Sequence, residues 1–200
     1  MSERRVGAAV TVGVVFRPQL PPEELRAVVR AADEAQVAEL WLWEDCFLEG
    51  GLTSAAAALA SSARLRVGVG LLPVPLRNPA LLAMEVATLA RLWPDRLMTT
   101  LGHGVGEWMA QVGAAVDSPM TLLREYAGAV RDLLDGRRVD LEGRYVRLDG
   151  VALDWPPARR PPVLVGGRGP RTVRLAGEEA DGVLLDSVTD PATVRRARAL

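Results

Sequence analysis

The chain has 200 residues, of which 49% are hydrophobic and 24% are charged, with a formal net charge of −1. This composition is typical of a folded domain with a sizeable core, and it argues against disorder, nucleic-acid binding and binding to an anionic membrane. The absence of lysine excludes a P-loop lysine and a Schiff base, and one histidine with one cysteine disfavours a metal site.

Strand and helix patterns alternate along the chain. Short apolar runs predict buried strands, and apolar residues three and four apart predict helices. Asn78 and Pro79 are typical of a helix start, and Pro94 of a stop. The predicted strands are residues 8–16, 38–43, 65–72, 96–102, 161–167 and 181–187, and the predicted helices are residues 21–36, 52–63, 78–93, 118–135, 170–180 and 191–200.

Residues 136–157 interrupt this alternation with period-two patterning, which predicts a β-hairpin near 137–155. The remainder predicts an α/β fold with a parallel sheet and right-handed crossovers, in one domain over residues 1–200. Six units fit either an open doubly wound sheet or part of an eight-fold barrel. The longest apolar runs are too short to span a membrane, and the single Cys46 permits no internal disulfide, which favours a cytoplasmic protein.

Both architectures bind ligands at the carboxyl ends of the strands. Four of the six predicted strand ends carry acidic residues or glycines. These are "EDC" (Glu44, Asp45, Cys46), "GL" (Gly70, Leu71), "LGHGVGEWM" (residues 101–109) and "GGRG" (Gly166, Gly167, Arg168, Gly169).

The motif "LGHGVGEWM" contains Gly102, Gly104 and Gly106, whose missing side chains would let a flat ring approach the backbone. A bend or bulge is the alternative explanation. His103 either faces the ligand or is hydrogen-bonded in the wall of the fold. Glu107 is either a polar contact to the ring or the first-turn carboxylate of a following helix.

The loop "VGGRGPRTV" joins a strand to a helix that begins with Pro170. Unpaired backbone N–H groups and the helix dipole at such a start bind phosphate, and Arg168 and Arg171 would add positive charge. An ordinary tight turn is the alternative. Asp45 and Glu44 are adjacent on extended chain, so at most one of them faces a shared ligand. Cys46 has no histidine neighbour in the sequence, which argues against a nucleophile.

Taken together, "LWLWEDCFLEGG", "RVGVGLLPVPLRNPALLAMEVATLARLWPDRLMTTLGHGVGEWMAQVG" and "PPVLVGGRGPRTVRLAGEEADGVLL" resemble the bacterial-luciferase-like superfamily. The similarity is strongest to the branch that uses the deazaflavin coenzyme F420, which includes methylenetetrahydromethanopterin reductase. It implies a TIM (β/α)8 barrel. Because the family barrel has eight units and this chain carries about six, the resemblance implies a barrel that is incomplete at the C-terminus.

The resemblance also implies roles for particular residues. It places a non-prolyl cis peptide between Gly70 and Leu71, behind the cofactor ring, and a phosphate cradle at Gly166, Gly167, Arg168 and Gly169 with Ser187, Val188 and Thr189. It implies Asp45 and Glu107 as polar or proton-relay residues and Trp108 as a wall of the substrate pocket. Cys46 stands where many members have histidine, so we count it among the substrate-side candidates, and His103 among the catalytic ones.

The implied activity is hydride transfer between coenzyme F420 and a small organic substrate. An FMN-dependent monooxygenase and a non-catalytic cofactor-binding protein are the alternatives. We expect no nucleic-acid or membrane partner. An incomplete barrel exposes two sheet edges, so we expect a homodimer or another pairing that covers them.

Overall fold

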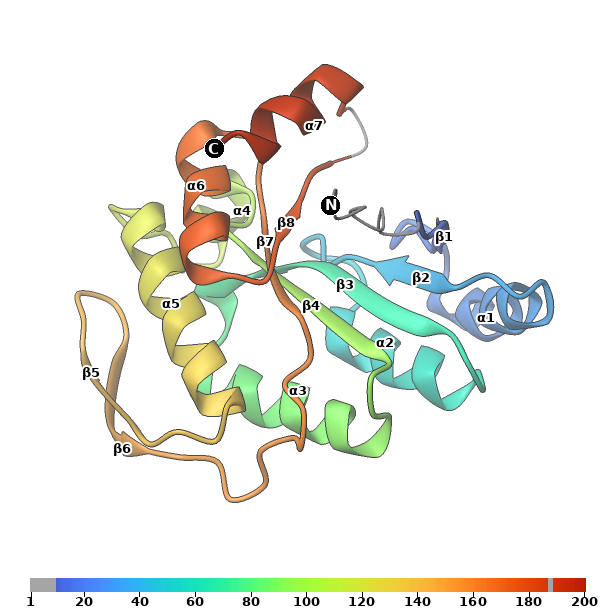
Figure 1. The fold of residues 1–200 in the computed structure, drawn as a ribbon, viewed down its shortest axis with the longest axis horizontal. Coiled ribbons are helices and arrows are strands. Elements are labelled where there is room, and N and C mark those ends of the chain that lie inside the picture. The colour runs from blue at the N-terminus through green and yellow to red at the C-terminus, as the bar shows by residue number, and fades with distance from the viewer. Residues whose placement is uncertain (1–9, 187–188) are drawn as a thin grey trace, which may run out of the picture.

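The computed structural model describes residues 10–186 and 189–200. Within these ranges the fold is built on a six-stranded parallel sheet (Figure 1). The strands follow one another across the sheet in chain order, without the reversal of strand order that marks a doubly wound sheet. In this order they are β1 (Gly13–Val15), β2 (Glu39–Leu42), β3 (Arg66–Pro73), β4 (Leu97–Gly102), β7 (Val163–Gly166) and β8 (Val183–Leu184).

Helices connect the strands, as the alternating pattern predicts. Asn78 accepts a hydrogen bond from the Ala80 N–H at 2.9 Å, so the predicted cap of α3 is confirmed. A short helix directly after β4, α4, had no predicted bounds. The helices are η1 (Pro22–Glu24), α1 (Leu25–Glu34), α2 (Gly51–Ala60), η2 (Val74–Leu76), α3 (Pro79–Leu92), α4 (Gly106–Gln111), α5 (Pro119–Leu134), α6 (Pro170–Glu179) and α7 (Pro191–Arg198).

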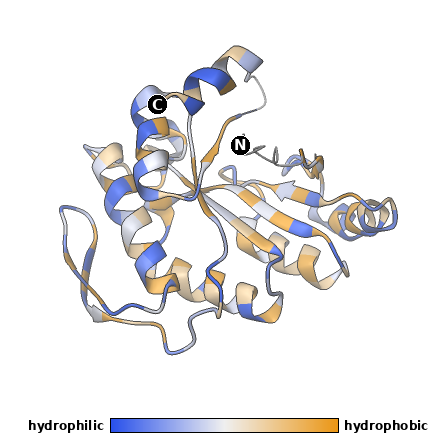
Figure 2. Ribbon diagram, in the orientation of Figure 1, coloured by the Kyte–Doolittle hydropathy of each residue, from blue (hydrophilic) through white to orange (hydrophobic). Residues whose placement is uncertain are grey.

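The main core lies between the sheet and its helices. On β2, Leu40 and Leu42 are buried, whereas Trp41 and the following Trp43 are partly buried and line the larger of two cavities. The apolar stripe predicted for α5, which includes Leu123 and Tyr126, is buried against the sheet. Figure 2 shows hydrophobic residues gathered on the strands and on α2 and α3, whereas α6 and α7 carry more hydrophilic residues.

The predicted hairpin is confirmed as the antiparallel pair β5 (Val139–Glu142) and β6 (Arg147–Val151). It lies outside the main sheet, beside α5 (Figure 1). The two outer strands of the main sheet, β1 and β8, are shorter in the described chain than the predicted ranges 8–16 and 181–187. Each has a hydrogen-bonding neighbour on one side only, and short strands are typical of sheet edges.

Candidate functional site

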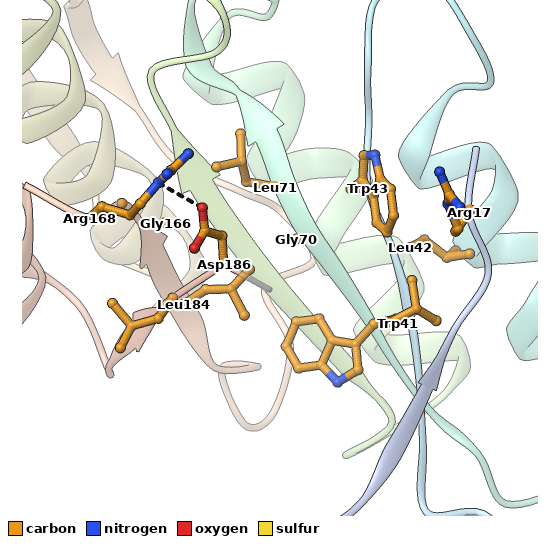
Figure 3. Close-up of a pocket in the computed structure, with 13 residues that line it drawn as sticks. Arg17, Trp41, Leu42, Trp43, Gly70, Leu71, Gly166, Arg168, Leu184 and Asp186 are labelled. Carbon is orange, nitrogen blue, oxygen red and sulfur yellow. Dashed lines mark ion pairs between the residues drawn. The ribbon is translucent and has the colours of Figure 1, made fainter. Parts of the chain in front are cut away.

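Two neighbouring cavities lie at the carboxyl ends of the strands, where the sequence places its candidate residues. The larger has a volume of about 960 Å³ and lies on the inner side of the sheet, between β1 and β8 (Figure 3). The smaller, of about 310 Å³, lies over the ends of β2, β3 and β4. Both cavities are lined by Trp43, Gly70, Leu71, Gly166 and Gly167. The smaller cavity also includes Asp45, His103 and Gly104, so the structure brings together candidates from four separate strand ends.

The peptide bond between Gly70 and Leu71 is cis, as the resemblance implies, and a second non-prolyl cis bond joins Cys46 and Phe47. Leu71 follows the cis bond and forms the wall that the two cavities share. A Cβ on Gly166 would lie 2.6 Å from Leu71 Cδ2, and a Cβ on Gly102 would lie 2.8 Å from Leu71 Cδ1. The Leu71 side chain is thus packed between two glycines.

This packing corrects the interpretation of the glycines after β4. Gly102 lacks a side chain because Leu71 occupies the space, so the expectation that it leaves open floor for a ligand ring is wrong. Gly104 has φ +71°, and its Cβ would lie 2.9 Å from the Pro73 Cβ, so it satisfies a turn. Gly106 faces open space at the start of α4. Of the three, only Gly104 lines a cavity.

Asp45 and Glu44 direct their carboxylates to different partners, as adjacent residues on extended chain should. The Trp43 indole donates a hydrogen bond to Asp45 Oδ2 at 2.9 Å, and both residues line the smaller cavity. Glu44 instead accepts two hydrogen bonds from the Arg77 guanidinium, at 2.5 and 2.7 Å, and one from the Gly51 N–H at 2.8 Å. Glu44 lines the smaller cavity as well, but Arg77 and Gly51 occupy both of its carboxylate oxygens, so Asp45 is the carboxylate better placed for a ligand there.

His103 satisfies both of the interpretations that the sequence left open. It lines the smaller cavity, and its Nε2 lies 3.3 Å from Thr172 Oγ1 in the first turn of α6. Its Nδ1 is buried and has no hydrogen-bond partner among the described residues. Burial lowers the pKa of His103, and the Pro119 carbonyl offsets this only in part. His103 is accordingly a neutral imidazole at pH 7.

Of the residues predicted for catalytic and substrate roles, Glu107 and Cys46 line neither cavity. Glu107 is exposed in the first turn of α4, whereas the next residue, Trp108, does line the smaller cavity. Cys46 is partly buried, and burial together with the charges of Glu44 and Asp45 raises the pKa of its thiol. A protonated thiol is a poor nucleophile, so Cys46 lacks the activation that nucleophilic catalysis requires.

The loop before α6 has the form that the phosphate prediction requires. Pro170 is the first residue of α6, and Gly169 lies at its exposed N-cap. A Cβ on Gly167 would lie 2.5 Å from Thr172 Cγ2, so only glycine fits there. Arg168 lines the larger cavity and pairs with Asp186, with 2.6 Å between Nε and Oδ2 (Figure 3).

The other residues predicted for the phosphate cradle are Ser187, Val188 and Thr189. Ser187 and Val188 lie outside the described residues, and Thr189 donates its backbone N–H to the Asp186 carbonyl at 3.1 Å. No cluster of three or more potential metal ligands occurs within the ranges that the structure covers. In those same ranges, none of the helices has the length and apolar character needed to cross a bilayer.

Sequence reasoning assigned no site role to several side chains that line or support the cavities. Trp41 lies on β2 and Trp43 directly after it, and this period-two spacing was the available signal that both rings face the larger cavity. Arg17 and Asp186 border the larger cavity (Figure 3). Arg77 supports Glu44, but nothing in the sequence pairs two residues that lie 33 positions apart.

The fold and the position of the cavities define a parallel α/β barrel type of protein whose ligand site lies at the strand carboxyl ends. Residues 4–200 match the family model described as luciferase-like monooxygenase, and the chain belongs to this family. A 5,10-methylenetetrahydromethanopterin reductase from Methanolobus tindarius is 26% identical over 179 residues, which cover 89% of this chain and 54% of the relative. An F420-dependent glucose-6-phosphate dehydrogenase from Nakamurella multipartita is 29% identical over 187 residues, which cover 86% of this chain and 55% of that relative.

Solved structures confirm the predicted barrel-like fold. The coenzyme F420-dependent tetrahydromethanopterin reductase from Methanopyrus kandleri superposes with a TM-score of 0.83 at 21% identity, covering 95% of this chain and 59% of that one. A monooxygenase from Streptomyces bottropensis superposes with a TM-score of 0.82 at 22% identity, and the match covers 94% of this chain and 64% of that one. The chain spans about half the length of the curated relatives it matches.

Proposed function

We propose that this chain binds the deazaflavin coenzyme F420 and takes part in hydride transfer between that coenzyme and a small organic substrate. The observation that carries the proposal is the wall formed by Leu71 after its cis peptide bond, with a cavity on each side. The names of the relatives from Methanolobus tindarius and Nakamurella multipartita support the choice of coenzyme. When bound, the deazaflavin would supply the ring carbon that accepts or donates the hydride.

The residues present fit such a group. The larger cavity has room for a tricyclic ring against Gly70 and Leu71. The first turn of α6 presents backbone N–H groups near Arg168, where a phosphate on the coenzyme tail would be held. His103 and Asp45 both line the smaller cavity, where they would contact a polar ligand atom.

On the substrate side, Asp45 and His103 would orient a polar group of the substrate, and Trp43 and Trp108 would provide aromatic walls. A neutral His103 can donate or accept one proton, so it could hold a proton beside the smaller cavity. Glu107 is exposed, and its role in the site stays a prediction that the Glu107→Gln variant tests.

FMN is the second candidate cofactor. It is supported by the family description, by the monooxygenase from Streptomyces bottropensis and by a riboflavin lyase with modified FMN, which superposes with a TM-score of 0.81 at 16% identity. A protein that binds a cofactor without turnover is the third candidate. Because F420 and FMN have different absorption spectra, titration with each one separates the first two proposals.

The test is a titration of the purified chain with F420 and with FMN, followed by an assay for hydride transfer with reduced F420 and candidate substrates. We expect saturable F420 binding, and we expect Asp45→Asn to raise the KM for the substrate. Asp149→Asn, an exposed carboxylate on the distant hairpin, serves as the control. Glu107→Gln should lower turnover without unfolding the protein, and an unchanged rate would remove Glu107 from the site. Preferential binding of FMN, or binding without turnover, would favour the second or the third candidate.

We also propose that the open sheet edges are covered by association of two copies in the cytoplasm. In the described chain β1 and β8 each pair on one side only, and Val12 and Val15 are 75% and 52% exposed. Light scattering should give the mass of a dimer for the unmodified protein, and Val15→Arg should lower the measured mass toward that of a monomer. Met84→Arg, on the exposed face of α3, is the matched control. Dissociation by Met84→Arg alone would place the contact on the helices instead.

A further inference from the structure

Arg77 connects three parts of the fold behind the cavities. It lies between η2 and α3, directly beyond the end of β3. Its Nη1 and Nη2 donate to the two carboxylate oxygens of Glu44 at 2.5 and 2.7 Å, the two-pronged geometry that only a guanidinium provides. Its Nε lies 3.8 Å from Glu85 Oε2 on α3. Arg77 therefore joins the segment after β2 to α3.

Glu44 extends this connection to the wall of the site. Its Oε2 accepts a hydrogen bond from the Gly51 N–H at the start of α2, at 2.8 Å. Its own backbone N–H donates to the Leu71 carbonyl at 3.3 Å, directly after the cis peptide bond. One carboxylate thus links the loop after β2, the start of α2 and, through its backbone, the residue that separates the two cavities.

The Arg77–Glu44 pair is largely removed from solvent. The side chain of Glu44 is 9% exposed and that of Arg77 is 21% exposed. The hydrogen bonds to Glu44 raise the pKa of Arg77, against the opposing effect of burial. Removing one member of such a pair leaves the other charge without compensation. The pair consequently holds its geometry much more tightly than a surface ion pair would.

Glu44 and the residues on either side of it all line the smaller cavity. Trp43 and Asp45 line the smaller cavity and are hydrogen-bonded to each other at 2.9 Å. Because Glu44 lies between Trp43 and Asp45 in the chain, fixing its side chain against Arg77 also restricts the backbone that carries these two neighbours. We infer that Arg77 is a positioning residue, which acts through Glu44 to hold Trp43, Asp45 and the Leu71 wall in their ligand-facing arrangement. The nature of the ligand rests on the proposed function, but the arrangement does not.

The chain contains a matched control on the same two strands. Arg66 on β3 pairs with Glu39 on β2 at 3.1 Å, at the opposite, amino-terminal end of the sheet. Glu39 also accepts a hydrogen bond from the Trp41 indole at 3.0 Å. Arg66→Met therefore breaks an ion pair between β2 and β3 without touching the segment that carries Trp43 and Asp45.

The experiment labels the five tryptophans with 5-fluorotryptophan and records fluorine NMR spectra without any coenzyme. Trp43→Phe assigns the resonance of Trp43. We expect Arg77→Met to shift this resonance, and Arg77→Lys to shift it less, because lysine keeps the charge but loses the two-pronged contact. Arg66→Met should shift the resonance of Trp41 and leave that of Trp43 in place.

The same variants are then titrated with F420. Because a displacement of about 1 Å in a binding group can cost up to about a hundredfold in function, we expect Arg77→Met to weaken F420 binding by about tenfold. The F420 affinity of Arg66→Met should remain within about twofold of that of the unmodified protein, even if the melting temperatures of Arg66→Met and Arg77→Met fall by similar amounts. Glu44→Gln, which keeps the shape of the side chain, should reproduce the effect of Arg77→Met, and it replaces that variant if Arg77→Met does not fold.

Two results would overturn the inference. One is an unmoved Trp43 resonance and unchanged F420 affinity in Arg77→Met or Glu44→Gln, with only the melting temperature lowered. The other is an equal shift of the Trp43 resonance in Arg66→Met. If the unmodified protein fails to bind F420, the proposed function fails, whereas the comparison of the spectra still decides the role of Arg77.

Discussion

Replacing Gly102 by alanine adds one methyl group where the Leu71 side chain already lies. The new Cβ would be 2.8 Å from Leu71 Cδ1 and 3.0 Å from Leu71 Cγ. Carbon atoms in contact are about 3.5–4.0 Å apart, so Leu71 would have to move by about 1 Å. Its movement is restricted, because the Leu71 Cδ2 methyl next to Gly102 also packs on Gly166.

The expected cost follows from two opposing effects. Overfilling a packed site destabilises a protein by about 1–3 kcal/mol. Alanine restricts the unfolded chain more than glycine does, and this effect alone raises the free energy of unfolding by about 0.4–1 kcal/mol. We therefore expect Gly102→Ala to lower the free energy of unfolding by about 1–2 kcal/mol. For a chain of 200 residues this corresponds to a fall in melting temperature of about 2–8 °C.

The assay is thermal and denaturant unfolding without ligand, with Gly106→Ala as the control. A Cβ on Gly106 would meet nothing within 4 Å, so this variant should be neutral or slightly more stable. In a Leu71→Ala background the overlap disappears, and Gly102→Ala should then cost much less. If Gly102→Ala leaves the unliganded protein unchanged yet abolishes F420 binding, Gly102 faces a ligand and the packing of Leu71 on it is incorrect.

Three further predictions concern titratable groups. Because burial lowers the pKa of His103, the unfolded chain binds more protons than the folded chain near pH 6. The free energy of unfolding should therefore fall as the pH drops below about 6.5, by at most about 1.4 kcal/mol per pH unit. His103→Gln should flatten this pH dependence in denaturant unfolding between pH 7 and 5.5, and an unaltered slope would contradict the effect of burial on His103. Glu125 accepts three backbone N–H groups from residues 144–146, which outweigh the opposing effect of burial and keep its pKa low. Glu125→Gln should therefore cost about 1–2 kcal/mol at pH 7 in urea unfolding, and this loss should shrink below about pH 4.5, as the unmodified carboxylate also becomes protonated. Burial and nearby carboxylates raise the pKa of Cys46, so iodoacetamide at pH 8 should alkylate it about fivefold or more slowly than the same thiol in urea, and equal rates would refute this.

Local sequence determined most of the secondary structure. The apolar spacing of α5 and the Asn78–Pro79 start of α3 act within a few residues, so they can be interpreted without knowing the fold. The period-two pattern around Gly143 likewise predicted the hairpin. The rule that ligands bind at the carboxyl ends of parallel strands correctly predicted that the candidate loops lie together, and the family resemblance supplied the cis bond at Leu71.

Only the tertiary structure decided which of the candidates face the cavities. The three glycines after β4 look equivalent in sequence, yet Gly102 accommodates Leu71, Gly104 makes a turn and Gly106 meets open space. Glu44 and Asp45 are adjacent acids, but Arg77 engages only Glu44. The partners involved lie about 30 positions away along the chain and meet only because β2, β3 and β4 are neighbours in the sheet. Spacing along a chain carries local geometry, whereas these roles depend on contacts between strands that the fold alone brings together.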